Sequence, residues 1–148
     1  MSADSTARAE PAKRPPRTLR DAHDRRFWEY CAAGELRMQR CAACAKLAWP
    51  PAGQDDHCDA CGGNQFSWER LSGRGRLRSF CTFERQYYPE CPPPWTVILV
   101  ELEEGPLFIS DPQGFGPEDA REGMPLALAF LACVDEHGEF RLPVFAPA

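Results

Sequence analysis

The chain has 148 residues and a formal net charge of −5, with 15 prolines and 11 glycines. No run approaches the roughly 18 consecutive apolar residues of a transmembrane helix, and frequent prolines and glycines favour short strands over long helices. The charge is uneven: residues 1–40 hold nine Lys/Arg against six Asp/Glu, whereas residues 41–148 hold eight against sixteen. An acidic body of this kind argues against sequence-independent nucleic-acid binding, which requires a basic face.

Residues 1–20 precede the first periodic apolar pattern. They are rich in Ala, Pro and Arg and contain no hydrophobic run, so we expect a disordered tail without a secretory signal. A cytoplasmic protein with reduced thiols follows from this expectation. From Asp21 to Ala33 the pattern becomes helical, with Phe27 and Cys31 on one face. A short helix with large aromatic side chains needs another surface to pack on.

Two Cys-x-x-Cys pairs follow the predicted helix. Cys41 and Cys44 form the first pair, and Cys58 and Cys61 form the second, with thirteen residues between the pairs. Two such turns facing each other provide the tetrahedral four-sulfur ligand set of a zinc ribbon, which leaves no open position for catalysis. Cys41, Cys44, Cys58 and Cys61 therefore predict a structural Zn²⁺ site, with iron in the same cage as the alternative.

Disulfides and redox activity are the competing interpretations of these cysteines. The remaining four cysteines (Cys31, Cys81, Cys91 and Cys133) follow no pairing pattern, and nothing near the N-terminus indicates secretion. A thioredoxin-like site uses one Cys-x-x-Cys at a helix start rather than two matched pairs. Both interpretations are therefore disfavoured.

Short strand-like runs separated by turn residues occupy the rest of the chain. The expected strands are Leu36–Arg40, Phe66–Leu71, Arg76–Phe83, Trp95–Leu102, Pro106–Ser110, Leu126–Val134 and Phe140–Phe145. After the cysteine pairs, five or six short strands without a long helix suit a small antiparallel barrel, because closure removes exposed edges. We expect an OB-type barrel, with a split sandwich as the alternative.

A group of three arginines stands out in the acidic body. Arg74, Arg76 and Arg78 recur at every second residue, which should place them on one face of a strand. A guanidinium group binds two phosphate oxygens at once, so the group is a candidate phosphate site. Pairing with surplus surface acids is the simpler explanation. Catalytic machinery is not indicated, since no histidine lies in a recognisable motif with Ser or Cys and no glycine-rich phosphate loop is present.

Several short motifs together resemble a known family. They are Phe27-Trp-Glu-Tyr30, Gly34-Glu-Leu-Arg-Met-Gln-Arg-Cys41, Pro50-Pro51, Ser72-Gly-Arg-Gly75, Val97-Ile-Leu-Val-Glu-Leu102, Gly123-Met-Pro125 and Leu142-Pro-Val-Phe-Ala-Pro147. In this order they resemble the zinc-ribbon plus OB-fold proteins associated with acyl-CoA metabolism, long catalogued as a domain of unknown function. The resemblance runs from about Asp21 to the C-terminus.

The expected fold is mainly β, with an N-terminal helix and a rubredoxin-like zinc ribbon in residues 21–65 and an OB-fold domain in residues 66–148. The resemblance implies a non-catalytic accessory subunit that binds acyl-CoA and forms a hetero-oligomer with a thiolase-like enzyme. The partner would perform thiolysis, retro-aldol cleavage or acyl transfer. The candidate CoA contacts are Arg74, Arg76 and Arg78, and the candidate interface residues are Phe27, Trp28, Tyr87 and Tyr88.

Two other functions remain as alternatives. Zinc ribbons and OB barrels also occur in nucleic-acid-binding proteins, although the acidic body and the absence of a Lys-rich face count against this role. A small enzyme acting on thioesters would need a nucleophile. Cys81 and Cys91 are the candidates, and neither has a histidine at a readable spacing.

Overall fold

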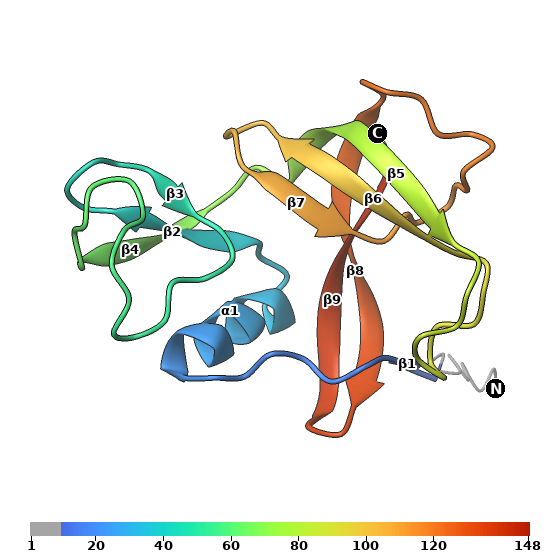
Figure 1. Ribbon diagram of the computed structural model, residues 1–148, viewed down its shortest axis with the longest axis horizontal. Helices are drawn as coiled ribbons and strands as arrows, with labels where there is room; N and C mark the ends of the chain where they lie inside the picture. The colour runs from blue at the N-terminus through green and yellow to red at the C-terminus, as the bar shows by residue number, and fades with distance from the viewer. Residues whose placement is uncertain (1–9) are drawn as a thin grey trace, which may run out of the picture.

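A computed structural model of the protein describes residues 10–148 (Figure 1), so residues 1–9 of the predicted tail lie outside the described residues. The elements are β1 (Ala12–Lys13), α1 (Ala22–Ala32), β2 (Arg37–Cys41), β3 (Leu47–Ala48), β4 (Phe66–Arg70), β5 (Arg74–Phe83), β6 (Trp95–Leu102), β7 (Leu107–Ser110), β8 (Pro125–Asp135) and β9 (Gly138–Pro147). The predicted mainly β fold with one N-terminal helix is confirmed. No helix among residues 10–148 is long and apolar enough to cross a membrane.

The strands form two sheets; in Figure 1 the smaller lies above α1 and the larger lies to the right of it. The smaller sheet has the order β3-β2-β4, and with its connecting turns we call it the ribbon (residues 37–70). The larger sheet has the order β1-β8-β5-β6-β7, with β9 paired to β8. β4 was predicted as the first strand of the OB domain, but it pairs along its length with β2. The structure therefore moves β4 to the ribbon, because a short apolar run does not reveal its own pairing partner.

The capping residue Asp21 and two buried side chains position helix α1. The Asp21 carboxylate accepts hydrogen bonds from two backbone N–H groups of the first turn at 2.9 and 3.4 Å, and from the backbone N–H of Gln54 in the ribbon at 2.8 Å. Phe27 and Cys31 are 4% and 0% exposed. Since positions i and i+4 share one face of a helix, this face packs inward, and α1 contacts both β2 and β9.

The larger sheet is curved, and β9 comes close to the segment that follows β7 (Figure 1). Beyond β7, the backbone N–H of Phe145 in β9 donates to the carbonyl of Asp111 at 3.2 Å, and the N–H of Gln113 donates to the carbonyl of Phe145 at 2.8 Å. These bonds form a single parallel bridge between Pro112 and Phe145. Among the described residues this one bridge joins β9 to the segment after β7, and no continuous ladder closes the sheet into a barrel there.

Gly75 permits a close approach of β5 to its antiparallel neighbour β6. A β-carbon at this position would lie 2.6 Å from Cγ1 of Val100 and 2.8 Å from the carbonyl oxygen of Glu101. Both distances are too short for a β-carbon, so this close approach of the two strands requires glycine.

A β-bulge at Arg78 changes which side chains of β5 face the interior. The register with β6 shifts at this residue, so that Leu77 lies opposite Val100 and Phe80 lies opposite Ile98. Val100 and Ile98 are 0% and 1% exposed, on the inner side of the sheet. Leu77 and Phe80 therefore lie on the same face of the sheet although they are three residues apart, but Leu77 is 1% exposed and Phe80 is 42% exposed.

Residues 10–20 follow the larger sheet instead of forming the predicted disordered tail. β1 pairs in parallel with β8, and Ala12 lies opposite Cys133. Arg14, Arg17 and Arg20 each form an ion pair with an aspartate. The prediction is wrong for residues 10–20 because it relied on composition. The prolines fix an extended backbone, and the arginines find carboxylates on the folded body.

Candidate metal centre and surrounding surface

The two Cys-x-x-Cys turns have the same local geometry. In each, the residue after the second cysteine donates its N–H to the carbonyl of the first cysteine, at 2.9 Å for Ala45 and 2.8 Å for Gly62. In each, the first cysteine donates its own N–H to a carbonyl five residues further on, at 2.9 and 2.6 Å. Ala45 and Gly62 both have left-handed backbone conformations, with φ of 66° and 78°. The turns thus present their cysteines in equivalent ways.

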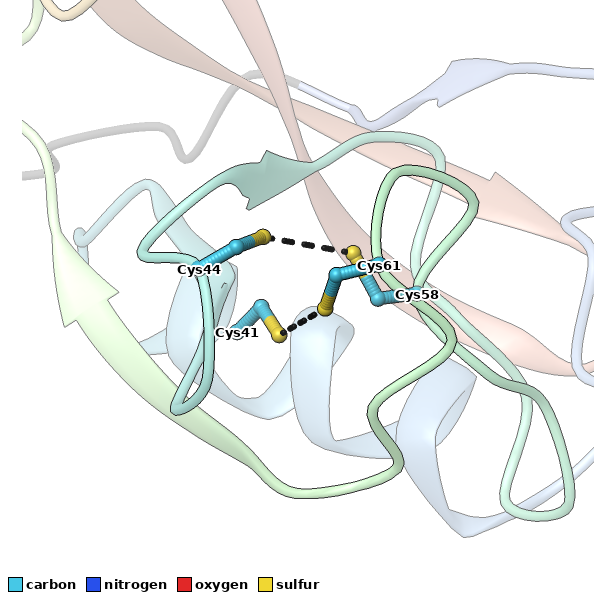
Figure 2. Close-up of side chains that lie close together, drawn as sticks. All are labelled: Cys41, Cys44, Cys58 and Cys61. Carbon is cyan, nitrogen blue, oxygen red and sulfur yellow. Dashed lines mark hydrogen bonds between the residues drawn. The ribbon is translucent and has the colours of Figure 1, made fainter.

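Figure 2 shows the four cysteine side chains pointing toward one another from the two turns. All four sulfur atoms lie within 4.8 Å of one another, and the Cys41–Cys61 and Cys44–Cys58 sulfur pairs are each 3.6 Å apart. Sulfurs bonded at about 2.3 Å to one tetrahedral ion lie about 3.8 Å apart, so this spacing fits a single metal ion. The structure brings together all four predicted ligands in a site that can hold a metal.

The opposite pKa shifts of the Cys41 and Cys61 thiols also fit a bound cation. Backbone N–H groups of Cys44 and Ala43 lower the pKa of the Cys41 thiol to about 7. The N–H of Gly63 lowers the pKa of Cys61, but the neighbouring thiols and burial raise it to about 12 overall. The Cys41 thiol therefore loses its proton readily, whereas deprotonation of Cys61 is opposed by the neighbouring thiols. A divalent cation removes this opposition.

An ion pair links the two turns outside the cage. Nζ of Lys46, just after the first turn, lies 2.7 Å from Oδ1 of Asp59 in the second turn. Asp59 raises the pKa of Lys46, and Cys58 and Cys44 add to this effect. The ammonium group is therefore positioned to offset part of the negative charge of a four-thiolate cage.

The three predicted phosphate-binding arginines are exposed, and each has a partner. Arg74 and Arg78 form ion pairs with Glu103 at 2.9 Å and Glu101 at 2.7 Å. Arg76 donates from Nη1 to the carbonyl of Gly123 at 3.0 Å. Pairing with surface acids, the simpler explanation of these arginines, is thus present for two of them. The bulge ends the regular alternation on which their common face was predicted.

The four predicted interface aromatics fall into two groups. Phe27 is 4% exposed, and its ring centroid lies 5.1 Å from that of Trp28 and 4.9 Å from that of Trp49. Its assignment to a partner interface is corrected, because the helix turns this side chain onto the protein's own sheets. Trp28 is half-buried and packs against other aromatic rings. Tyr87 and Tyr88 are 67% and 53% exposed on the β5–β6 connection.

The predictions from sequence missed the arginines of the N-terminal segment. Arg14, Arg17 and Arg20 occur at every third residue among prolines. A polyproline II chain has three residues per turn, so this spacing places all three side chains on one side. This three-residue spacing could therefore have predicted from the sequence that the three arginines share one side of the segment.

Comparison with known proteins gives one family and several relatives. The family model described as "ChsH2, C-terminal OB-fold domain" matches residues 68–131. A solved structure of the "Ltp2-ChsH2(DUF35) aldolase" superimposes with a TM-score of 0.74 and 31% sequence identity, covering 88% of this chain and 98% of that chain. The OB fold of the larger sheet is thereby supported.

Two curated relatives are longer proteins. The probable enoyl-CoA hydratase alpha subunit of Thermomonospora curvata is 32% identical over 148 residues, covering 95% of this chain and 44% of the relative. The 3-oxo-4,17-pregnadiene-20-carboxyl-CoA hydratase alpha subunit of Mycobacterium tuberculosis is 32% identical over 108 residues, covering 71% of this chain and 32% of the relative. The chain thus spans less than half the length of either curated relative.

Proposed function

Because this chain belongs to the DUF35 family that includes ChsH2, we propose that it is a non-catalytic accessory subunit that binds acyl-CoA and supports a thiolase-like partner enzyme. The observation that carries the proposal is the likeness to the DUF35 chain of the Ltp2-ChsH2 aldolase, which this chain covers almost completely. The name of that assembly joins two proteins, Ltp2 and ChsH2, in one aldolase. By analogy, this chain would form a hetero-oligomer with an enzyme similar to Ltp2.

The names of the curated relatives support the acyl-CoA part of the proposal. Both relatives are named as alpha subunits of hydratases, and both names contain a CoA ester. This chain matches only a part of each relative, so the shared part would contribute to the handling of CoA esters without being the whole hydratase. A role beside a catalytic partner is consistent with both names.

The metal centre supports a structural role within such a subunit. We propose that Cys41, Cys44, Cys58 and Cys61 bind Zn²⁺, which four thiolates would hold in a closed tetrahedral shell. A closed shell offers no site for water or substrate, so the metal would fix the ribbon and not act on the thioester. All eight cysteines of the chain lie within the described residues and are free thiols. This state favours a reducing compartment such as the cytoplasm.

The chain's own side chains favour catalysis in the partner. Nδ1 of His23 lies 2.8 Å from the carbonyl oxygen of Ala52, and His137 lies in a turn beside Glu136. Among residues 10–148, no histidine forms a hydrogen bond with the side chain of a serine, threonine or cysteine. The described part of the chain therefore contains no serine, threonine or cysteine side chain that is hydrogen-bonded to a histidine base.

We assign the phosphates of CoA to Arg74, Arg76 and Arg78. The ion pairs of Arg74 and Arg78 with glutamates are largely exposed, and exposed pairs of this kind contribute little to stability. A phosphate group can displace such a carboxylate at little cost, and it adds a second charge-assisted bond. Arg76 is the best single candidate, because its guanidinium contacts only a neutral carbonyl.

The partner interface is assigned to the β5–β6 connection. Tyr87 and Tyr88 are exposed there, and the Phe83 and Tyr87 rings lie edge-to-face with centroids 5.9 Å apart. Aromatic side chains exposed in a group are typical of protein interfaces, since they bury much area at low entropic cost.

Co-purification tests the whole proposal. The tagged chain is isolated from its host, and the retained proteins are identified by mass spectrometry. A thiolase-like enzyme in fixed stoichiometry is the expected result. Retention of nucleic-acid-associated proteins through high-salt washes would replace the proposal with the nucleic-acid alternative.

Calorimetric titration with an acyl-CoA then tests the arginine assignment in the reconstituted complex. Arg76→Gln should weaken binding by about tenfold, the loss expected for one charge-assisted contact to phosphate. Arg25→Gln on the exposed side of α1 is the matched control and should bind as the unmodified complex does. Equal affinity of the Arg76→Gln and Arg25→Gln complexes would rule Arg76 out as a CoA contact.

A further inference from the structure

Residues 10–20 cross the molecule from the larger sheet to helix α1 (Figure 1), and we call them the strap. Their backbone attachment is slight. β1 contributes two residues to a ladder, and the N–H of Arg14 donates to the carbonyl of Val134 at 3.0 Å. None of the strap residues belongs to the buried core cluster. The strap is therefore held mainly by its three arginines, each of which contacts a different part of the fold.

Arg14 fastens the start of the strap to the barrel. Its Nη1 lies 2.7 Å from Oδ2 of Asp111, and the two side chains are only 17% and 15% exposed. The guanidinium group also lies over the ring of Trp95, with 5.1 Å between Cζ and the ring centroid. This contact pins the strap beside the closing bridge of the barrel.

Arg17 fastens the middle of the strap to the turn between β8 and β9. Its guanidinium donates twice to the Asp135 carboxylate, at 2.8 and 3.2 Å, and its backbone N–H donates to the same carboxylate at 2.9 Å. The group also lies 4.3 Å from the ring centroid of Phe140 and 5.5 Å from that of Trp28. Trp28 belongs to α1 and Phe140 to β9, so Arg17 covers the contact between helix and barrel.

Arg20 fastens the end of the strap to α1 and the ribbon. It donates to the Asp24 carboxylate at 2.9 and 3.1 Å and to the carbonyl of Pro51 at 3.0 Å. Three arginines on one side of an extended segment thus bridge barrel, helix and ribbon in turn.

We propose that the strap is a releasable brace, which fixes the ribbon and α1 against the barrel while its arginines are paired and which detaches locally without unfolding the core. Segments with little buried apolar area open at lower free energy than the core does. Detachment uncovers the edge of β8 at Cys133, the residue opposite Ala12. This inference goes beyond the acyl-CoA role and does not depend on it.

Two buried cysteines report on this opening separately. Cys133 and Cys31 are both 0% exposed, but Cys31 belongs to the core cluster and Cys133 does not. Release of the strap should expose Cys133, which lies opposite strap residue Ala12, and should leave Cys31 covered by the core cluster, whereas global unfolding exposes both. Comparing their modification rates therefore distinguishes the two events within one molecule.

The experiment is thiol modification of the full metal-loaded chain with N-ethylmaleimide, read at each cysteine by mass spectrometry. Cys133 should react at least about tenfold faster than Cys31 in the unmodified protein, and 1 M salt should accelerate Cys133 selectively by screening the arginine pairs. Arg17→Gln should accelerate Cys133 by about tenfold or more. Arg26→Gln, which removes an exposed pair with Glu29 outside the strap, should leave both rates unchanged.

Equal rates for Cys133 and Cys31, in the unmodified protein and in Arg17→Gln alike, would show that only global unfolding opens this edge and would overturn the proposal. If Arg17→Gln does not fold, the salt dependence of the unmodified protein decides the question by itself. A Cys133 rate that is independent of salt would likewise overturn the proposal.

Discussion

The ribbon and the barrel are stabilised by different means, although they share one core. Between Cys41 and Phe66 the chain contributes a single residue, Leu47, to the buried core cluster. Strands β5 to β9 contribute most of the rest, including Val100 and Phe145, both 0% exposed. A segment with so little apolar burial needs a different constraint, and a metal bound to the four converging sulfurs would supply it. Cross-linking by that metal would then stabilise the ribbon as burial of apolar area stabilises the barrel.

Replacing one of the four cysteines should produce the largest difference between the two regions, because it should affect the ribbon and leave the barrel unchanged. Cys41→Ser should lower the zinc content from stoichiometric to near zero, because structural zinc binding of about 10–16 kcal/mol depends on the complete ligand set. Hydrogen exchange should rise in the ribbon turns and stay low in β6 and β8. The measurements are elemental analysis and exchange mass spectrometry. Cys81→Ser, at an exposed thiol outside the cage, is the control. Full zinc content in Cys41→Ser would refute this ligand set.

The converse change removes barrel core and leaves the sulfurs intact. Phe145→Ala deletes a fully buried ring that lies 6.1 Å from the Phe108 ring, which should cost about 3–5 kcal/mol of unfolding free energy. Urea titration measures the loss, and zinc content per folded chain should not change. Phe83→Ala, at a ring that is 42% exposed, should cost much less. Similar losses for the two variants would mean that Phe145 is not a core residue.

A pH titration tests how firmly the strap is joined to the barrel. Burial alone would raise the pKa of Asp135, but hydrogen bonds from Arg17 and His137 lower it to about 2. A carboxyl group with a lowered folded-state pKa stabilises the fold above its unfolded value near 3.8. This stabilisation is lost as the pH falls from about 4 to about 2.

The stabilisation amounts to roughly 2 kcal/mol, and Asp135→Asn should abolish its pH dependence. The free energy of unfolding is measured for the unmodified protein and for Asp135→Asn at pH 7 and at pH 3. Any release of metal in acid then affects both proteins alike. Parallel curves for the two proteins would contradict the lowered pKa.

The smallest expected effects come from exchanging residues between the two cysteine turns. Ala45 has a φ of 66°, which is costly for a residue with a β-carbon, so Ala45→Gly should stabilise the ribbon by about 1 kcal/mol. Gly62→Ala should destabilise it by a similar amount through backbone conformation alone, since a β-carbon there meets nothing within 4 Å. Chelator competition measures both changes as shifts in metal affinity. A loss of affinity in Ala45→Gly would show that the turns are not equivalent.

Local signals in the sequence were sufficient for the metal centre and for most strands. The cysteine spacing fixes each turn by itself, and the run Trp95–Leu102 coincides with β6 as observed. Non-local information was missing elsewhere. The pairing of β4 with β2, the inward turn of Phe27 and the carboxylate partners of the strap arginines all depend on residues distant in the sequence. The bulge at Arg78 escaped prediction because alternation assumes an unbroken ladder.

That bulge also sets a rule for changes in the length of β5. Arg78 is the one extra residue of β5, so deleting it would join the Leu77–Val100 and Ser79–Leu99 pairs into an unbroken ladder and would leave Phe80 opposite Ile98, on its present face. The second half of β5 is therefore out of phase with the first half by one residue. Between the bulge and Phe83, insertions or deletions would need to come in twos to keep the same side chains on the same face of the sheet.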